Sequence, residues 1–285
     1  MLIKGAEVAA KIDEQTKNDA KALADAGHPA MLAVVRVGEK PDDIYYEASA
    51  VKRAEKLGVL SKRVTLDADA AQSEIENAVR DCSQDSAVSG ILLLRPLPKD
   101  IDEDAVIRLI DPKKDVDGIT RGSLASVFAG RGEGFAPCTP EACMRILEHY
   151  GVELSGKKVT VVGRSLVVGK PLSMLLLGRN ATVTICHSRT KDLKSVCREA
   201  DVLIAAVGRA NMIDADYVKE GQVVVDVGIN ADENGKMVGD VSRDSVEGVV
   251  SMLTPVPGGV GTVTTSVLLS NTVCAAETIL KENIR

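Results

Sequence analysis

The sequence predicts an α/β protein in which two domains, each built on a parallel sheet, flank a cleft. Short β-branched runs alternate with longer, charged amphipathic segments, which is typical of β-α-β units with helices on both faces of a sheet. The 285 residues favour two domains, and the alternation pauses near residues 135–140 before it resumes. A cleft between two such domains is a usual place for a small ligand.

In the first half of the chain, apolar runs predict strands and longer charged segments predict helices. The predicted strands cover 31–38, 61–66 and 89–98, and the predicted helices cover 41–58, 69–85 and 102–110. We expect Asp42 or Asp43 to cap the helix that begins at residue 41, and Gly58 to end it. The loop DPKKDVDGIT follows the last of these helices.

In the second half, a helix over 140–151 comes first, with a proline in its first turn and a glycine at its end. The predicted strands then cover 157–163, 181–188, 201–208, 221–229 and 250–253, and the predicted helices cover 169–179 and 191–199. The final segment, from Val263 onward, has helical periodicity.

Composition argues against several classes of protein. The 35 basic residues are outnumbered by 41 acidic ones and form no block, so a nucleic-acid partner is not expected. The first residues lack the apolar core of a signal peptide, and no run approaches the roughly 18 apolar residues of a membrane helix. Six cysteines without a CxxC pair and three scattered histidines predict reduced thiols and no metal site. The prediction is a cytoplasmic protein with no membrane partner.

A candidate nucleotide-binding turn lies in VVGRSLVVGKPL, which follows a predicted strand and opens a predicted helix. Gly163 and Gly169 stand six apart, and Ser165 takes the place of the usual second glycine. Gly163 allows a tight turn, and Gly169 lets the helix N-terminus, whose free N–H groups suit an anion, approach a ligand. On spacing alone, an ordinary strand-to-helix turn remains the alternative.

The end of the next strand favours NADP over NAD. An NAD site usually has Asp or Glu about 20 residues after the glycines, bound to the ribose 2′-hydroxyl. Here the strand ends in His187-Ser188-Arg189-Thr190, without a carboxylate. Ser188, Arg189 and Arg164 could instead surround a 2′-phosphate through charge-assisted hydrogen bonds. The alternative is that Arg189 is a solvated surface residue, and we expect His187 to have a packing or surface role.

Several segments together carry the pattern of a known family. They are KKDVDGIT (113–120), PCTPEACMRIL (137–147), VVGRSLVVGKPLSMLLL (161–177), ATVTICHSRT (181–190), VVVDVGIN (223–230), GDV (239–241) and TPVPGGVGTVTTSVL (254–268). Over nearly its whole length the chain resembles the methylenetetrahydrofolate dehydrogenase/methenyltetrahydrofolate cyclohydrolase family. The resemblance implies a homodimer and two domains. A folate-binding catalytic domain would cover 1–120, with a C-terminal helix (265–285) packed back on it, and an NADP-binding Rossmann domain would cover 121–264.

The resemblance also implies roles for individual residues. Tyr46 would stack on the folate substrate, and the Asp117 carboxylate would accept from the paired N–H donors of its pterin. The implied substrate-binding loop comprises Pro257, Gly258, Gly259 and Gly261, where missing side chains allow close backbone approach. The implied NADP contacts are Gly163, Arg164, Ser165, Ser188 and Ile229. From the residues alone, Asp117 could instead cap its own loop, and PGGVG could be an ordinary turn.

The sequence departs from the family at the residues that hydrolyse the methenyl product. Bifunctional members carry Tyr-x-x-x-Lys, with the lysine one helical turn from the tyrosine, and Ala50 stands at that lysine here. A glutamine that supports the lysine is replaced by Leu94. Lys52 lies about 200° around the helix from position 50 and should face elsewhere.

The predicted enzyme is therefore an oxidoreductase of one-carbon metabolism that oxidises 5,10-methylenetetrahydrofolate to 5,10-methenyltetrahydrofolate with NADP, with weak or absent cyclohydrolase activity. Hydride transfer depends on positioning, whereas hydrolysis needs an activated water and proton transfer. Two alternatives remain open. One is a fully bifunctional enzyme that produces 10-formyltetrahydrofolate, with Lys52 or Arg95 reaching the site. The other is a catalytically silent NADP-binding sensor.

Overall fold

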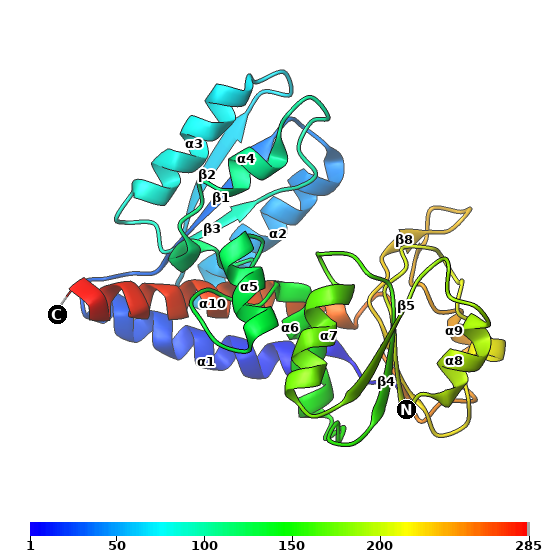
Figure 1. Ribbon diagram of the computed structural model, residues 1–285. Helices are drawn as coiled ribbons and strands as arrows, with labels where there is room; N and C mark the ends of the chain where they lie inside the picture. The colour runs from blue at the N-terminus through cyan, green and yellow to red at the C-terminus, as the bar shows by residue number, and fades with distance from the viewer. Residues whose placement is uncertain (284–285) are drawn as a thin grey trace. The chain divides into compact units, whose positions relative to one another are not determined.

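The computed structural model describes residues 1–283 and confirms the predicted α/β class (Figure 1). The chain divides into two compact units. The three-stranded unit comprises Lys11–Cys138 and the chain from Thr265 onward. The five-stranded unit comprises Met1–Ala10 and Thr139–Thr264. The division falls within α1 (Gly5–Asp25) and α10 (Val260–Asn283), and at the start of α6 (Cys138–His149).

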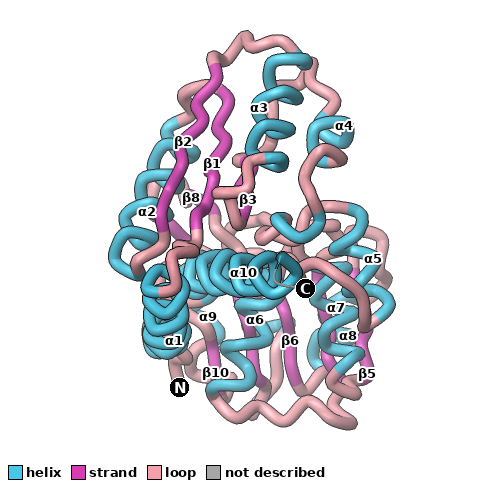
Figure 2. The backbone as a smooth tube through the Cα atoms, turned by 90° about the vertical axis from the view of Figure 1, so that its left-hand side faces the viewer, coloured by secondary structure: helices cyan, strands magenta, loops and turns pink. Residues whose placement is uncertain are grey.

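The three-stranded unit has a parallel sheet in the order β2-β1-β3, with helices on both faces (Figure 2). Its strands are β1 (Met31–Val37), β2 (Leu60–Leu66) and β3 (Gly90–Leu93). Its helices include α2 (Pro41–Leu57), α3 (Gln72–Gln84), α4 (Glu103–Ile107) and α5 (Arg121–Ala129), with the 3-10 turn η1 (Pro112–Lys114). α2 lies on one face of the sheet, and α3 and α4 lie on the other (Figures 1 and 2).

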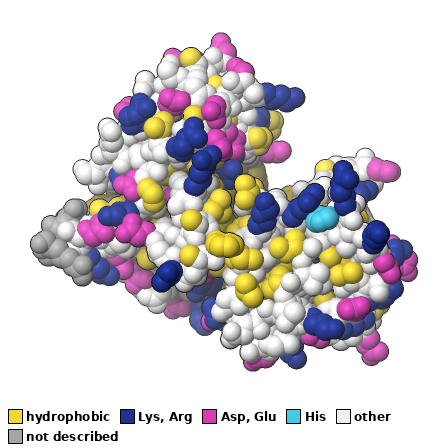
Figure 3. All heavy atoms as spheres, in the orientation of Figure 1, with side chains coloured by type: hydrophobic (Ala, Val, Ile, Leu, Met, Phe, Trp, Pro, Cys, Tyr) yellow, Lys and Arg dark blue, Asp and Glu magenta, His cyan; other side chains and the backbone are white. Residues whose placement is uncertain are grey.

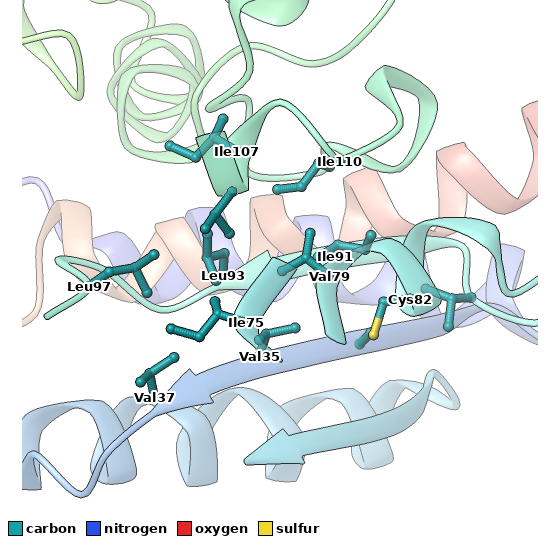
Figure 4. Close-up of a cluster of buried hydrophobic side chains, with 13 residues drawn as sticks. Val35, Val37, Ile75, Val79, Cys82, Ile91, Leu93, Leu97, Ile107 and Ile110 are labelled. Atoms are coloured by element: carbon teal, nitrogen blue, oxygen red, sulfur yellow. The ribbon is translucent and has the colours of Figure 1, made fainter. Parts of the chain in front are cut away.

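The hydrophobic core of this unit follows from the spacing of apolar residues along its strands and helices. Alternate residues of β1 point to one face of the sheet, and positions one turn apart on α3 face them. Figure 4 shows the resulting cluster, to which β1 contributes Val35 and Val37, and α3 contributes Ile75 and Val79. All four side chains are buried, so α3 is held on the sheet by apolar contacts.

The start of α2 differs from the prediction. The N-cap is Lys40, Pro41 is the first helical residue, and neither Asp42 nor Asp43 caps the helix. The prediction was wrong because proline, whose φ is preset for the first helical position, starts the helix ahead of both aspartates. Both carboxylates still lie in the first turn, where their negative charge interacts favourably with the positive end of the helix dipole. Gly58 ends the helix in the left-handed region, as predicted.

The five-stranded unit has a parallel sheet in the order β10-β7-β6-β4-β5. Its strands are β4 (Lys158–Val162), β5 (Thr182–Cys186), β6 (Val202–Ala205), β7 (Val223–Asp226) and β10 (Met252–Leu253). α7 (Gly169–Gly178) lies on one face of the sheet, and α8 (Leu193–Glu199) and α9 (Arg243–Val246) lie on the other (Figure 1). A 3-10 turn, η2 (Ala215–Tyr217), and an antiparallel pair, β8 (Asn230–Ala231) and β9 (Met237–Val238), complete the unit.

Two predicted elements end or begin at other residues. β3 stops at Leu93, although the prediction extended it to residue 98, because the prolines that follow have no N–H for a sheet ladder. α10 begins at Val260, three residues ahead of the helical periodicity noted in the sequence. Residues 284 and 285 of the predicted C-terminal helix lie outside the described residues.

α10 meets the length and hydropathy criterion for a membrane-spanning helix over Val260–Glu282, contrary to the expectation that no segment would. In its most apolar window, 56% of the residues are buried inside the fold. A core helix of a soluble protein passes the same test, so this is weak evidence for a membrane span.

Candidate functional site

The candidate nucleotide-binding turn follows β4 directly. Gly163 has a φ of 132°, and a Cβ there would lie 2.1 Å from the carbonyl oxygen of Ala206. Only glycine therefore fits, and the loop after β4 touches the loop after β6. Because β5 lies on one side of β4 and β6 on the other, this is the topological switch point of the sheet. Ligands of open α/β sheets bind at such points, outside the carboxyl ends of the strands.

The start of α7 packs tightly against this turn. A Cβ at Gly169 would lie 2.2 Å from the carbonyl oxygen of Gly163, so the second glycine serves close packing between helix and turn. The Ser165 hydroxyl oxygen accepts from the Val168 N–H at 3.0 Å, which orders the loop. Arg164 and Ser165 are exposed beside the helix N-terminus, where dipole and free N–H groups favour an anion.

The loop after β5 places the residues that favour NADP on the surface. Ser188 and Arg189 are exposed. His187 is hydrogen-bonded within its own turn. Its ring Nδ1 accepts from the backbone N–H of Arg189 at 3.2 Å, and its backbone N–H donates to the Thr190 hydroxyl oxygen at 2.9 Å. These bonds agree with the expectation that His187 has a structural role rather than a catalytic one.

The PGGVG segment also belongs to the five-stranded unit. Gly258 has a φ of 101°, and a Cβ at Gly259 would lie 2.4 Å from the carbonyl oxygen of Pro255. A Cβ at Gly261 would lie 3.5 Å from the side chain of Ile229, which is 65% exposed. The structure thus brings part of the predicted substrate loop next to a predicted cofactor contact.

Tyr46 and Asp117 come together in the three-stranded unit. Burial raises the pKa of the Tyr46 phenol, and the charge of Asp117 and the nearby Cys138 thiol raise it further. A hydrogen bond with Thr265 lowers that pKa without reversing the shift, so the phenol stays protonated at neutral pH. The sequence predicted the first two of these residues. Cys138 and Thr265 were missed because they are far from α2 in the sequence and only the fold of this unit brings them to Tyr46.

The Asp117 carboxyl has an unusual environment. Burial raises its pKa to about 6, whereas the Arg95 guanidinium and a hydrogen bond with Cys138 act in the opposite direction. A carboxylate held in this way is a strong hydrogen-bond acceptor at neutral pH and a neutral acid a little below pH 6. The Arg95 guanidinium also lies 3.4 Å from the carboxylate of Glu103.

The loop that carries Asp117 is held by its neighbour Asp115. The Asp115 side chain is buried and accepts from the N–H groups of Ile119 and Thr120 at 2.9 and 2.7 Å, and from the Ser123 hydroxyl at 2.6 Å. The sequence left open that Asp117 caps this loop, but the structure gives the capping bonds to Asp115.

Ala50 is fully buried on α2, one helical turn from Tyr46. Leu94 is 6% exposed and follows β3. Lys52 is exposed, in agreement with its predicted position on another face of the helix. Of the two basic residues considered as substitutes for the family lysine, Arg95 is the one whose charge acts on Asp117.

Across residues 1–283, no group of three or more His, Cys, Asp or Glu side chains could hold a metal ion. On the face of the molecule in Figure 3, Lys and Arg side chains lie among acidic and apolar ones.

Two family models match the chain. The model described as "Tetrahydrofolate dehydrogenase/cyclohydrolase, catalytic domain" matches residues 3–117, and the model described as "Tetrahydrofolate dehydrogenase/cyclohydrolase, NAD(P)-binding domain" matches residues 137–280. The chain is 50% identical over 276 residues to the bifunctional protein FolD of Clostridioides difficile, covering 97% of this chain and 96% of that protein. It is 51% identical over 275 residues to that of Carboxydothermus hydrogenoformans, covering 96% of each.

Solved structures give the same family. The bifunctional methylenetetrahydrofolate dehydrogenase/cyclohydrolase FolD of Campylobacter jejuni has a TM-score of 0.95 at 40% identity, covering 98% of this chain and 99% of that chain. The Trypanosoma brucei dehydrogenase-cyclohydrolase, solved with NADP cofactor and inhibitor, has a TM-score of 0.92 at 33% identity, covering 100% of this chain and 98% of that chain.

The packing of α7 against its turn predicts the effect of adding one methyl group. Gly169→Ala should lower the free energy of unfolding by about 1–3 kcal/mol, because the new Cβ meets rigid backbone. Gly178→Ala, in the same helix, is the matched control: nothing lies within 4 Å of a Cβ there. Its free energy of unfolding should stay constant or rise by up to about 1 kcal/mol. Urea denaturation measures both, and equal stability of the two variants would contradict the packing argument.

Proposed function

The chain belongs to the tetrahydrofolate dehydrogenase/cyclohydrolase family, and we propose that it is a methylenetetrahydrofolate dehydrogenase with little or no cyclohydrolase activity. It would oxidise 5,10-methylenetetrahydrofolate to 5,10-methenyltetrahydrofolate by hydride transfer to NADP. The observation that carries the proposal is Ala50, buried one turn from Tyr46 where bifunctional members have a lysine.

NADP is the cofactor. The NAD(P)-binding family domain covers residues 137–280, and the related Trypanosoma brucei enzyme was solved with NADP. When bound, NADP supplies the hydride acceptor. We assign its binding to Gly163, Arg164, Ser165, Ser188, Arg189 and Ile229, which all lie in the five-stranded unit. The exposed Arg189 is suited to the 2′-phosphate, since a guanidinium forms paired, charge-assisted hydrogen bonds with phosphate oxygens.

The folate substrate is assigned to Tyr46 and Asp117 and to the loop of Pro257, Gly258, Gly259 and Gly261. The Tyr46 ring would stack on the substrate while its phenol stays protonated. The Asp117 carboxylate would accept from the pterin N–H donors and so fix the ring in one orientation. The loop would offer backbone at close range, because Gly259 leaves no room for a Cβ and Gly258 has a positive φ that side chains rarely adopt.

The dehydrogenation step does not require a side chain that acts as an acid, a base or a nucleophile. Hydride leaves a carbon flanked by two nitrogens, and the resulting positive charge is shared between them, so no side chain must move a proton. Orientation of the two reactants carries most of the acceleration. Tyr46 and Asp117 supply that orientation on the folate side.

Hydrolysis of the methenyl product makes a different demand. It needs an activated water and a group that exchanges protons, which contributes about 10²–10⁴-fold. Ala50 and Leu94 have no titratable atom and lie buried at the two positions concerned. The alternative of a fully bifunctional enzyme is favoured by the name "bifunctional" given to the Clostridioides difficile relative and by the position of Arg95 near Asp117.

The remaining assignments concern domains and setting. We propose that folate binds the domain over 1–120 and NADP the domain over 121–264. The compact unit that holds Tyr46 also includes the chain from Thr265 onward, which supports the packing of the C-terminal helix on the folate domain. We further propose a cytoplasmic homodimer, as the family resemblance implies.

The proposal is tested by two assays on one preparation. The purified protein should reduce NADP in the presence of methylenetetrahydrofolate, and its hydrolysis of methenyltetrahydrofolate should stay close to the uncatalysed rate in buffer. The double variant Ala50→Lys, Leu94→Gln should gain hydrolysis, whereas Ala50→Lys alone should gain less because its supporting partner is missing.

Lys52→Ala is the control, since an exposed lysine on another helix face should affect neither assay. Hydrolysis by the wild-type protein well above the uncatalysed rate would refute the loss of cyclohydrolase activity. Loss of that hydrolysis in Arg95→Leu would then identify Arg95 as the substitute.

The pKa of Asp117 predicts a pH dependence of substrate binding. The carboxylate form binds the pterin, so the KM for methylenetetrahydrofolate should rise as pH falls below about 6, by about tenfold per pH unit. Above that pH the KM should be level. In Asp117→Asn the KM should be higher and should lack this step. The same rise in Asp117→Asn would assign the titration to another group.

The choice of NADP over NAD predicts a selective effect of Arg189. Arg189→Ala should raise the KM for NADP by about tenfold or more, since hydrogen bonds to charged groups contribute about 1.5–3 kcal/mol. The KM for NAD, which lacks the 2′-phosphate, should change little. Lys191→Ala removes one charge from the same exposed loop and is the control. Equal turnover of NAD and NADP by the wild-type enzyme would contradict the role of Arg189.

A further inference from the structure

Two buried aspartates in the five-stranded unit have no role in the mechanism above. Asp226 is the last residue of β7, and Asp240 follows β9. The first is 3% exposed and the second is not exposed at all. Aspartate is almost never buried to this degree unless its oxygens are bonded. The partners of these oxygens therefore indicate what the two residues do.

The Asp240 carboxylate fills a concave run of backbone N–H groups in the loop after β6. One oxygen accepts from Val207 at 2.6 Å and from Gly208 at 3.0 Å. The other accepts from the Arg209 N–H at 2.9 Å and from the Asn230 side-chain amide at 2.9 Å. Three successive N–H groups that converge on one point form an anion site. Here the protein's own carboxylate occupies it.

Asp226 in turn holds Asp240. Its oxygens accept from the backbone N–H groups of Gly228, Asp240 and Val241, each at 2.9 Å. Burial raises the pKa of Asp226 to about 6, and these three N–H groups oppose that rise. A Cβ at Gly228 would lie 2.4 Å from an Asp240 oxygen, so the backbone closes directly over the carboxylates.

The loop that Asp240 holds lies at the switch point of the sheet. It follows β6 and touches the nucleotide-binding turn, since a Cβ at Gly163 would meet the Ala206 carbonyl oxygen at 2.1 Å. The same carboxylate also binds Asn230, the neighbour of Ile229. Asp240 thus connects two segments that border the crevice in which a dinucleotide binds.

We propose that Asp240 is a positioning residue for NADP: it fixes residues 207–209 and the segment around Ile229 in the arrangement that the cofactor requires, before the cofactor arrives. It does so without offering its N–H-bound oxygens to the ligand. The three backbone N–H groups of the loop after β6 are therefore already occupied, and the anion-binding task is left to the N-terminus of α7. The inference rests on the proposed function only in taking the switch point as the NADP site.

A purely structural role would look different in solution. A buried carboxylate that only stabilises the fold would, when replaced, lower the melting temperature and the fraction of active protein. It would leave the affinity of the folded fraction for NADP unchanged. A positioning role changes that affinity, because the loop must first be ordered at the expense of binding free energy.

The test compares NADPH binding by Asp240→Asn and by Asp232→Asn with that of the wild-type protein. In Asp240→Asn an amide N–H₂ replaces an oxygen that accepted backbone N–H groups. At least one hydrogen bond is then lost, because two N–H donors face each other. The dissociation constant for NADPH, followed by its fluorescence, should rise by about tenfold or more. The KM for NADP should rise in parallel, and the KM for methylenetetrahydrofolate should change by less than about twofold.

Asp232→Asn is the matched control. The Asp232 carboxylate also accepts two backbone N–H groups, from Asn234 and Lys236 at 2.9 Å each, but in the turn between β8 and β9. Its replacement should leave the NADPH dissociation constant at the wild-type value. An unchanged constant in Asp240→Asn, or an equal rise in both variants, overturns the inference.

If Asp240→Asn does not fold, the inference is tested by amide hydrogen exchange of the wild-type protein without cofactor. The amides of Val207, Gly208 and Arg209 should exchange slowly, since each donates to the buried carboxylate. Rapid exchange of these three amides before NADPH is added overturns the inference. Because NADPH binding is measured without folate, a wild-type protein that binds NADPH but does not oxidise methylenetetrahydrofolate contradicts the proposed function and not this inference.

Discussion

A buried aspartate that accepts backbone N–H groups holds the loop on which each proposed site depends. In the three-stranded unit it is Asp115, bonded to Ile119 and Thr120. In the five-stranded unit it is Asp240, bonded to the loop after β6. An unbonded N–H in such a place costs about 1–3 kcal/mol, so each carboxylate specifies one loop conformation and disfavours the others. Neither aspartate needs to touch a ligand to determine where the ligand-binding groups lie.

This arrangement suits a reaction whose rate depends on placement. Hydride transfer between two bound molecules gains most from fixed relative positions, and fixed loops provide them. The proposed loss of hydrolysis removes two side chains and leaves that framework intact. Ala50 and Leu94 are buried, and neither side chain has a polar atom with which to hold a loop. One activity can therefore disappear from the family's fold without cost to the other.

The sequence predicted the parallel sheets well, because strands such as β1 and β4 are β-branched runs with no competing helical pattern. It predicted α2 but not its cap, since Pro41 and the two aspartates after it are both start signals and only the backbone decides between them. The helix α1 was not predicted, although Val8, Thr16 and Ala20 repeat at multiples of four and are buried. The two-residue strands β8 and β9 are too short to have a period at all.

The predicted folate-site residues were found from a family pattern, and most of the nucleotide-site residues were found from local motifs. The geometry around them was not predictable in the same way. DVDG contains two aspartates of identical chemistry. Only the conformation of the turn determines that Asp115 accepts the backbone N–H groups and that Asp117 interacts with the charge of Arg95. GDV was noticed as a motif, but its meaning depends on a loop more than 30 residues earlier in the chain.

The same reasoning limits what Arg95 can do in place of the absent lysine. Its guanidinium lies close enough to Asp117 for its positive charge to lower the pKa of that carboxyl. A guanidinium does not release its proton in proteins, however, whereas an ammonium with a lowered pKa can exchange one. Arg95 can therefore orient a carboxylate or a water but cannot act as the general base that activates it. In the proposed function, Arg95 keeps a positive charge near Asp117, whereas Ala50 supplies no ammonium group to exchange protons.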